Sequence, residues 1–462
     1  IISTSLLAMS TSIIISAVTF AVIGCAILAA KGFRGRVDTI GVDLGTTFSV
    51  VGVKQGGEVS IIVDEEGRSL VPSVVAFLEN GEDVLVGYDA LGRLSTHAQA
   101  TIFNSKRFIG RRWDDDTTQE YGKAHPYHIV QCNSSVSNYS TVAFAIPVGD
   151  DHSAPSQTRV VSPEDIGTHI LRHLKTLTAN FLGHSQVSKA VIAVPAKFTS
   201  NQRAATGAAY KAAGLKVVRV IEEPTAAAVA YKLHTKSNVH HILVYDFGGG
   251  TLDVSILYVA KGSVSVYATD GDDDLGGSDF DMCLNDALLT ILSSFDHASV
   301  QETDTLFATL SDNKTEQEVA RLLKSSHGTC PDELCASPSI RQKSENVKKA
   351  LTWNSSVEFS CDALVRGTNE QLQVEKISFE VSKDFFESSC EHLFQRSLLP
   401  VTRLLNELEM QRSDIDEVVL VGGSTRIPLV KKQLREYFDG RALNDGIDPD
   451  ITVAYGAASI LD

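Results

Sequence analysis

His241 to Val259 read HILVYDFGGGTLDVSILYV, and this stretch carries the clearest structural signal in the chain. Its first part is a short apolar run that is typical of a buried strand and ends at Asp246. Three glycines follow. Beyond Thr251 apolar and polar residues alternate, which indicates a second strand. The stretch therefore predicts a β-hairpin closed by a glycine turn. It is not a P-loop, because no G-x-x-x-x-G-K-[ST] occurs anywhere in the sequence.

A glycine turn beside an aspartate suits a polyphosphate ligand. The backbone N–H groups of Gly248, Gly249 and Gly250 can converge on an anion because no Cβ atoms stand in the way. Asp246, at the mouth of the turn, could hold a hydrated divalent cation such as Mg²⁺. The alternative is an ordinary glycine-rich hairpin with an acidic residue nearby, and this one motif does not separate the two.

A second copy of the pattern favours the phosphate site. Residues 39–53 read TIGVDLGTTFSVVGV, which is again a strand, an aspartate, a glycine turn and a strand. Asp43 matches Asp246 and Gly45 matches Gly248, and each pair is 203 residues apart. Such an internal repeat predicts two similar lobes, each offering one hairpin to a nucleotide between them.

The composition is that of a globular protein large enough for two or more domain cores, with 462 residues of which 43% are hydrophobic. Its net charge of −16 argues against nucleic acid or an anionic membrane surface as the main partner, but not against ATP. No C-x-x-C pair occurs among the seven cysteines, so no zinc cluster is predicted. Cys330 and Cys335 could pair with each other in an oxidising compartment.

The first 30 residues contain no charged side chain, and residues 13–30 are almost entirely apolar. Such a segment is either the hydrophobic region of a signal peptide or a short membrane anchor, with residues 31–37 as a linker behind it. The basic residues of this linker favour a downstream domain in the cytosol. Four N-x-[ST] sequons favour the lumen of the secretory pathway instead. They are Asn133, Asn138, Asn313 and Asn354.

Two charged residues between the hairpins are candidates for catalysis. Lys106, in the basic run 104–112, could orient an attacking water beside a γ-phosphate, or could belong to a solvated basic cluster. Glu223 follows a predicted strand and precedes a proline. It could act as a base or hold a magnesium-bound water, or could be an ordinary glutamate at a helix N-terminus. A further glycine turn, Gly276-Gly277, could meet a β-phosphate.

Periodicity predicts the remaining elements. Ser162 and Pro163 open one helix, and Asp448-Pro449-Asp450 are expected to cap the last helix. Residues 293–340 are expected to be mostly a long loop or insertion. Further helices are predicted at 201–213, 226–231 and 344–351, and strands at 190–195, 217–221 and 418–421.

Seven motifs occur in the order found in one known family. They are GVDLGTTFSVVGV, SKRFIGRR, VIEEPTAAAVAY, VYDFGGGTLDVSIL, LGGSDFD, VVLVGGSTRIP and DPDITVAYGAA. Residues 38–462 therefore resemble the nucleotide-binding domain of the heat shock protein 70 family. The resemblance implies an α/β, actin-like two-lobed ATPase fold with duplicated ribonuclease-H-like lobes. Lobe I would be 38–235 completed by 445–462, and lobe II would be 236–444 with an insertion near 293–342.

The resemblance also implies roles for individual residues. The catalytic set would be Lys106, Glu223, Asp246 and Thr251. Hydrated Mg²⁺ would be held by Asp43 and Asp246, with Asp253 near a monovalent cation such as K⁺. The interlobe switch that senses ATP or ADP would be Pro195 and Arg203. The phosphates would be bound by Gly45, Thr46, Thr47, Phe48, Gly248, Gly249, Gly250, Thr251, Gly276 and Gly277. The adenosine pocket would comprise Glu345, Lys348, Lys349, Thr352, Gly422, Gly423, Ser424, Arg426 and Asp450.

The sequence departs from the family pattern in three places. Lys349 stands where the family usually has an arginine that stacks on adenine, so reduced adenine affinity is expected. The stretch at 293–342 is longer than usual. The sequence ends at Asp462, where the family continues into a substrate-binding domain, and this resembles microsome-associated members that consist of the ATPase core.

The predicted function is an ATP-hydrolysing core of a chaperone of the secretory pathway, without its own peptide-binding domain. The predicted location is the lumenal side of the endoplasmic reticulum or microsome, and the alternative is a membrane-anchored core that faces the cytosol. J-domain co-chaperones and nucleotide exchange factors are the implied partners. Two other functions stay open: a nucleotide-gated binding module with low turnover, and a sugar-kinase-like phosphotransferase.

Overall fold

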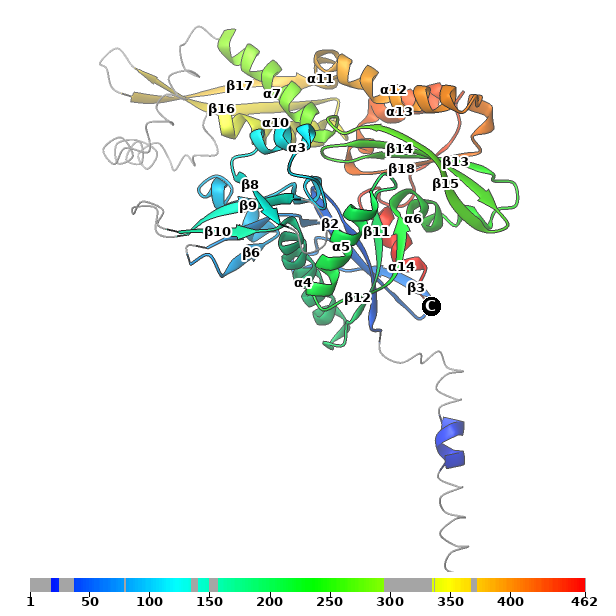
Figure 1. The fold of residues 1–462 in the computed structure, drawn as a ribbon. Coiled ribbons are helices and arrows are strands. Elements are labelled where there is room, and N and C mark those ends of the chain that lie inside the picture. Colours follow the sequence, from blue (N-terminus) through cyan, green and yellow to red (C-terminus); the bar gives the residue numbers. More distant parts are fainter. Residues whose placement is uncertain are drawn as a thin grey trace, which may run out of the picture. The chain divides into compact units, whose positions relative to one another are not determined.

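The chain forms two compact units (Figure 1). Unit 1 comprises Ile1–Tyr231 and Ile451–Asp462, and unit 2 comprises Lys232–Asp450. The computed structural model describes residues 18–24, 37–78, 80–133, 140–148, 157–294, 335, 337–366 and 372–461. Most of the apolar segment predicted at 1–30 and of its linker lies outside these residues. Within the described ranges, no helix has both the length and the apolar character needed to cross a membrane.

The main sheet of unit 1 contains the first predicted hairpin. Its strand order is β12-β11-β1-β2-β3. The first three strands form an antiparallel meander, in which Asp43 of β1 pairs with Val50 of β2. β11 and β12 extend the sheet in parallel from the other side of β1. The bounds are β1 Thr39–Leu44, β2 Phe48–Gln55, β3 Glu58–Ile61, β11 Lys189–Val194 and β12 Lys216–Glu222.

The main sheet of unit 2 repeats this topology. Its order is β15-β14-β13-β18-β19, again with an antiparallel meander followed by two parallel strands. The central hairpin, β13 and β14, is the one predicted from residues 241–259. Both predicted hairpins and the duplication are therefore confirmed. The bounds are β13 His241–Phe247, β14 Leu252–Ala260, β15 Ser263–Asp272, β18 Glu417–Val421 and β19 Leu443–Asn444.

The helices of unit 1 begin at or within three residues of the predicted positions. Ser162 caps α4 through a capping box with Asp165, and Thr199 caps α5 in the same way with Gln202. α6 begins at Glu223, three residues earlier than predicted, because Pro224 fits the first turn. α14 packs on β1, β2 and α6. The bounds are α4 Pro163–Leu182, α5 Ser200–Ala212, α6 Glu223–Ala230 and α14 Thr452–Ser459.

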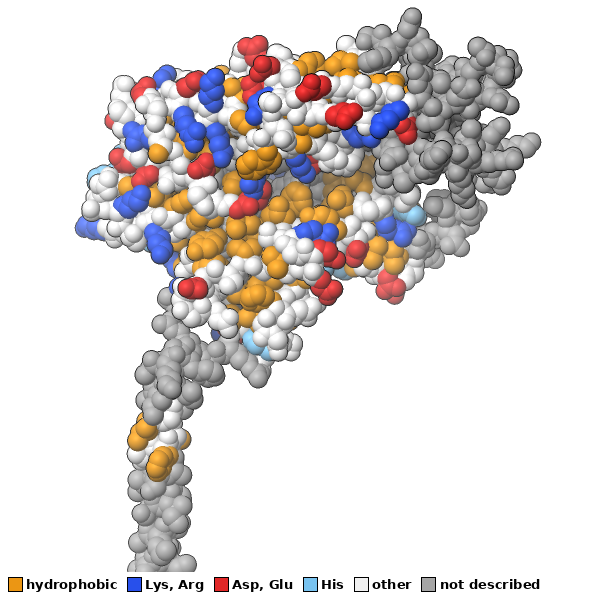
Figure 2. Space-filling model, turned by 180° about the vertical axis from the view of Figure 1, so that it is seen from behind, with side chains coloured by type: hydrophobic (Ala, Val, Ile, Leu, Met, Phe, Trp, Pro, Cys, Tyr) orange, Lys and Arg blue, Asp and Glu red, His pale blue; other side chains and the backbone are white. Residues whose placement is uncertain are grey.

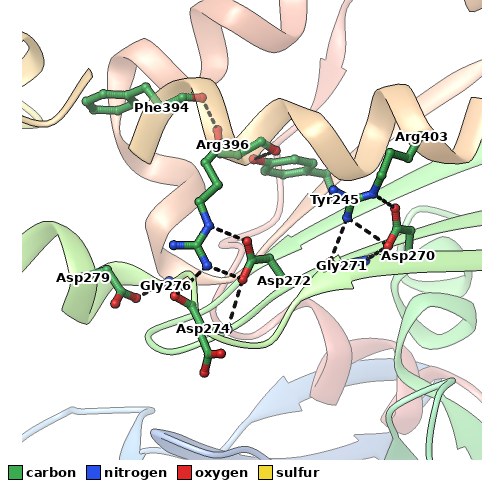
Figure 3. Close-up of polar contacts among 11 residues, drawn as sticks. Tyr245, Asp270, Gly271, Asp272, Asp274, Gly276, Asp279, Phe394, Arg396 and Arg403 are labelled. Atoms are coloured by element: carbon green, nitrogen blue, oxygen red, sulfur yellow. Dashed lines mark hydrogen bonds and ion pairs between the residues drawn. The ribbon is translucent and has the colours of Figure 1, made fainter. Parts of the chain in front are cut away.

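In unit 2 the helices share a core with the main sheet and with a second hairpin, β16–β17. α12 lies along β15, to which Arg396 and Arg403 bind it through bidentate ion pairs with Asp272 and Asp270 (Figure 3). The bounds are α7 Gly277–Ser294, α10 Ser337–Leu351, β16 Ser356–Arg366, β17 Leu372–Ser382, α11 Lys383–Ser389, α12 Glu391–Glu407 and α13 Pro428–Tyr437.

The shorter elements lie mainly in unit 1. β5, β6 and β7 form one small sheet, and β8, β9 and β10 form another. The bounds are β4 Val71–Pro72, β5 Val75–Phe77, β6 Val84–Val86, α2 Tyr88–Leu91, η1 Ala98–Ala100, β7 Thr101–Ile102, η2 Ser105–Arg107, α3 Asp116–Lys123, β8 His128–Asn133, β9 Ser140–Val148, β10 Gln157–Val161, η3 Leu233–Thr235, η5 Arg412–Asp414 and η6 Gly423–Arg426.

Two predicted element boundaries are wrong. The loop predicted up to residue 340 already ends at Ser337, where α10 begins. Ser344 is buried in this helix, and its hydroxyl donates to the Ile340 carbonyl. A polar residue on the inner face interrupts the apolar pattern, which is why the first part of the helix was not predicted. The predicted acidic cap of the last helix is also absent. α14 has no side-chain cap, and Asp450 pairs with Arg426 instead.

The predicted Cys330–Cys335 pair is wrong as well. Cys335 is bonded to Cys361, which joins the chain just before α10 to β16. A second disulfide, Cys283–Cys390, joins α7 to the start of α12. Sequence spacing favoured the nearest cysteine, whereas the fold brings together cysteines that are 26 and 107 residues apart.

Candidate functional site

The turn of the first hairpin, in unit 1, is built for close backbone packing. A Cβ atom on Gly45 would lie 2.1 Å from the carbonyl oxygen of Phe48, so only glycine fits. The hydroxyl of Ser73 donates to the Gly45 carbonyl at 2.8 Å, and this hydrogen bond fixes the position of the turn. Asp43 is the next-to-last residue of β1 and is half-buried, and Thr46 and Thr47 form the turn itself.

Lys106 and Glu223 form a largely buried ion pair in the same unit. The ammonium of Lys106 donates to Oε1 of Glu223 at 2.7 Å, and each side chain is 14% exposed. Lys106 therefore does not belong to a solvated basic cluster. Lys106 lies in a 3-10 turn that follows Asn104, a residue in the left-handed conformation. Glu223 lies at the N-terminus of α6, where the helix dipole favours its carboxylate.

Arg203 connects the end of β11 to the residue beside Glu223. Its guanidinium donates to the carbonyl oxygens of Ala196 and Phe198 and to Oε1 of Glu222 at 3.1 Å. Pro195 directly follows β11 and begins the loop that Arg203 holds. The two predicted switch residues are thus brought together within unit 1, next to the Lys106–Glu223 pair.

A small pocket lies between the first hairpin and Lys106. It opens beside Gly45 and Lys106, and Thr206 of α5 contributes to its wall. The rest of the lining is mostly apolar, from Leu44, Ile109, Pro163, Gly167, Ile170, Ala193, Val194 and Phe198, together with Ser105. An apolar wall lowers the local dielectric constant. The attraction of an anion to Lys106 and to the backbone N–H groups of the glycine turn is therefore stronger here than in water.

In unit 2 the second hairpin carries two aspartates in register. Asp246 of β13 lies directly opposite Asp253 of β14. Carboxylates at opposed positions repel each other, so a cation close to both is favourable here. This arrangement fits the predicted magnesium and monovalent cation chemistry.

Within unit 2, the Gly276-Gly277 turn lies against the Gly248–Gly250 turn of the hairpin. A Cβ atom on Gly276 would come within 2.3 Å of the Gly250 nitrogen, so the two turns pack backbone to backbone. The N–H of Gly277 donates to the Gly248 carbonyl at 3.0 Å. Arg396 holds the segment before this turn through Asp272 and the Asp274 carbonyl (Figure 3).

Two more predicted segments meet these turns. The hydroxyl of Ser424 donates to the Gly248 carbonyl at 2.8 Å. The ammonium of Lys348 donates to the Gly277 carbonyl and binds Asp281, both at 2.7 Å. The structure therefore brings four distant sequence motifs of unit 2 to one place.

Charged pairs surround the predicted adenosine pocket. Arg426 binds Asp448 and Asp450. Burial raises the pKa of Asp450, and the ion pair with Arg426 opposes this only in part. Burial also acts to raise the pKa of Glu345, but the 2.6 Å ion pair with Lys349, the charge of Lys348 and a hydrogen bond from Gln342 together outweigh burial, so this pKa is lowered.

Comparison with known families identifies the chain. The model of the family described as Hsp70 protein matches residues 39–327 and 319–461, which is most of the sequence. The chain belongs to the Hsp70 protein family. Its mixed α/β fold is that of the actin-like ATPases, and the Hsp70 family comprises ATP-binding chaperones with ATPase activity.

Within this Hsp70 protein each unit gathers its own share of the predicted residues. In unit 1 these are Asp43, Gly45, Thr46, Thr47, Phe48, Lys106, Pro195, Arg203 and Glu223. In unit 2 they are Asp246, Gly248, Gly249, Gly250, Thr251, Asp253, Gly276, Gly277, Glu345, Lys348, Lys349, Thr352, Gly422, Gly423, Ser424, Arg426 and Asp450.

Sequence reasoning missed three supporting residues of this Hsp70 site. Ser73 holds the first turn, Asp281 fixes Lys348, and Arg396 holds the segment before Gly276. Asp281 lies inside the LGGSDFD motif, so its spacing could have drawn attention to it. Ser73 and Arg396 are single polar residues far from any motif, and no pattern distinguishes them.

Proposed function

We propose that this Hsp70 protein binds and hydrolyses Mg²⁺-ATP as the ATPase core of a chaperone. The observation that carries the proposal is the Lys106–Glu223 pair, with each side chain only 14% exposed, beside the glycine turn of unit 1. An ion pair largely removed from water is costly to desolvate and is weak support for stability, so its position beside a glycine turn suited to an anion favours a catalytic role.

Each group of residues has its own proposed role in hydrolysis. Backbone N–H groups at Gly45–Thr47 and Gly248–Gly250 bind phosphate oxygens. Asp43 and Asp246 are the residues that would hold a hydrated Mg²⁺, and Asp253 would lie near a monovalent cation. When bound, Mg²⁺ would supply positive charge against the charge that develops on the phosphates. The ammonium of Lys106, fixed by Glu223, orients the attacking water, and the Glu223 carboxylate is positioned to take its proton.

A single-turnover assay tests this proposal. Purified protein is mixed with substoichiometric ATP and Mg²⁺, and inorganic phosphate is followed over time with and without candidate sugars. Phosphate release that does not depend on sugars is expected. Phosphoryl transfer to a sugar would instead indicate a phosphotransferase, and binding without product formation would indicate a nucleotide-gated binding module.

We propose that the protein acts in the secretory pathway, with its core in the lumen of the endoplasmic reticulum. Two disulfides support an oxidising compartment. The exposed sequon residues Asn133 and Asn354 agree with it, whereas Asn138 and Asn313 lie outside the described residues. The apolar segment near the start of the sequence suits membrane targeting.

Protease protection on intact microsomes tests the location. A lumenal core is expected to resist protease until detergent is added, and to change mobility after glycosidase treatment. Digestion without detergent, together with unaltered mobility, would place the core in the cytosol. The mass of the native protein, measured from tissue, tests whether a peptide-binding domain is present.

We further propose J-domain co-chaperones and nucleotide exchange factors as partners. Val218 and Val220 of the edge strand β12 are 48% and 47% exposed, and Figure 2 shows hydrophobic side chains gathered on the rear face of the molecule. Exposed apolar side chains on a sheet edge support a protein partner. Stimulation of phosphate release by a purified J-domain protein is the expected result.

A further inference from the structure

Tyr210 of α5 is fully buried, yet its hydroxyl has no hydrogen-bond partner among the described residues. Two other tyrosines are buried to a similar degree and differ in this respect. Tyr127 donates to the Phe103 carbonyl at 2.5 Å, and Tyr245 donates to the Ser397 carbonyl at 3.1 Å. Native proteins almost always satisfy a buried hydroxyl with protein or ordered water. The Tyr210 hydroxyl is therefore expected to bind a group that is not protein.

The helical position of Tyr210 directs its ring toward the site of unit 1. Thr206 lies one turn earlier on the same buried face of α5, and it lines the pocket that opens beside Gly45 and Lys106. Long side chains on a helix lean toward its N-terminus and cover the preceding turn. The phenol ring of Tyr210 therefore extends over the turn that carries Thr206.

Two carboxylates of the site act on this phenol. Burial is the main reason that the pKa of Tyr210 lies well above its ordinary value, and the negative charges of Asp43 and Glu223 raise this pKa further. The hydroxyl consequently keeps its proton at neutral pH and can act as a donor. Oε1 of Glu223 already accepts from Lys106, so a water that accepts from the phenol could donate to the carboxylates.

We propose that Tyr210 is a positioning residue of the ATPase site, whose hydroxyl donates a hydrogen bond to a water molecule held also by the carboxylates of Asp43 and Glu223. The inference rests on the proposed function and deepens it. A water ordered between Asp43 and the proposed base would take part in the hydrolytic step, whereas the residues proposed to bind adenosine all belong to unit 2. Tyr210 should therefore affect the hydrolytic step and not nucleotide affinity.

Tyr210→Phe tests the proposal because it removes the hydroxyl and keeps the ring. The single-turnover rate is expected to fall about three- to tenfold, which corresponds to the loss of one hydrogen bond in the transition state. Calorimetric affinity for Mg²⁺-ADP is expected to stay within about twofold, and the melting temperature of the nucleotide-free protein should barely change. Tyr245→Phe is the matched control: it breaks a protein hydrogen bond, so it should lower the melting temperature and leave the single-turnover rate unchanged.

Three results would overturn the inference. A Tyr210→Phe variant that hydrolyses ATP at the wild-type rate would show that the hydroxyl does nothing in the reaction. A variant whose melting temperature and affinity fall together with its rate would show a structural role only. A wild-type chain that binds nucleotide and hydrolyses none would refute the proposed function and this inference together, whereas the first two results leave the proposed function standing.

Discussion

At the residue scale, two lysines of unit 1 make ion pairs of the same length in different surroundings. Lys106 binds Glu223 at 2.7 Å with 14% exposure on both sides, and Lys189 binds Asp38 at 2.7 Å with 44% and 39% exposure. An exposed pair contributes little because water and salt screen it. Burial therefore distinguishes the lysine proposed to act on substrate from one that lies at the surface.

Lys106→Ala should lower the single-turnover rate of ATP hydrolysis by about a hundredfold or more, because its charge acts in the transition state. ATP affinity should change much less. Thermal unfolding is followed in parallel, since the mutation leaves Glu223 buried without its cation. Lys189→Ala is the control and should retain the wild-type rate. Equal rates in wild type and Lys106→Ala would refute the assignment.

Lys349→Arg should tighten ATP binding. The proposed role of Lys349 is to lie against adenine, and a planar guanidinium can stack there while it keeps the ion pair with Glu345. A stacking contribution of about 0.5–2 kcal/mol is expected, measured by calorimetric titration. The control is Lys343→Arg on the same helix, where the lysine donates to the Ser360 carbonyl and affinity should not change. Unchanged affinity in Lys349→Arg would show that this residue does not face the base.

At the element scale, the two hairpins and the capped helix α4 could be predicted because their signals are local. Alternation of apolar and polar residues fixes a strand, and Ser162-Pro163 fixes a helix start. The partners of Cys335 and Cys390 could not be predicted, because disulfide pairing depends on which strands and helices become neighbours. The same holds for β11 and β18, whose sheet neighbours lie far away in the sequence.

The two disulfides should stabilise unit 2 unequally. By the loss of chain entropy, closing the 107-residue separation of Cys283–Cys390 contributes about 5 kcal/mol, and the 26-residue separation of Cys335–Cys361 about 3.5 kcal/mol. Replacing both cysteines of a pair by alanine should lower the free energy of unfolding in that order, measured in urea without reductant. Cys132→Ala, which removes a free thiol, is the control. Two variants as stable as wild type would contradict the pairing.

His125 should make the element that carries Lys106 sensitive to acid. The amide nitrogen Nδ2 of Asn104 can only donate, so Nε2 of His125 accepts from it, and Nδ1 donates to the Tyr121 carbonyl. Burial, followed by the nearby charge of Arg107, lowers the pKa of His125 below its ordinary 6.5. The neutral ring therefore contributes stability above pH 6.5, and this is lost as the pH falls through the lowered value.

Urea unfolding between pH 7.5 and pH 5 measures this effect. His125→Phe keeps the ring contacts and removes the titrating group, so its stability should fall less steeply with acid than that of wild type. The remaining slope is expected from His169 and His173, whose pKa values burial also lowers. Identical slopes in both proteins would exclude His125 as a source.

At the scale of the whole molecule, duplication is the feature that the sequence predicts best. Two matching aspartate–glycine turns 203 residues apart predict two similar sheets, and the strand orders agree. The positions of Ser73 and Tyr210 relative to those turns could not be predicted, because single buried polar residues follow no period. The proposed function requires both hairpin aspartates for one reaction.

Single-turnover hydrolysis by Asp43→Asn and Asp246→Asn, each measured against wild type, tests this claim most directly. Asparagine keeps the size of the side chain and removes the charge proposed to hold a hydrated magnesium ion, so each variant should lose roughly a hundredfold or more in rate while its melting temperature stays close to wild type. Asp64→Asn, at an aspartate that pairs with Arg68, should retain the full rate. Wild-type hydrolysis in either hairpin variant would contradict the account.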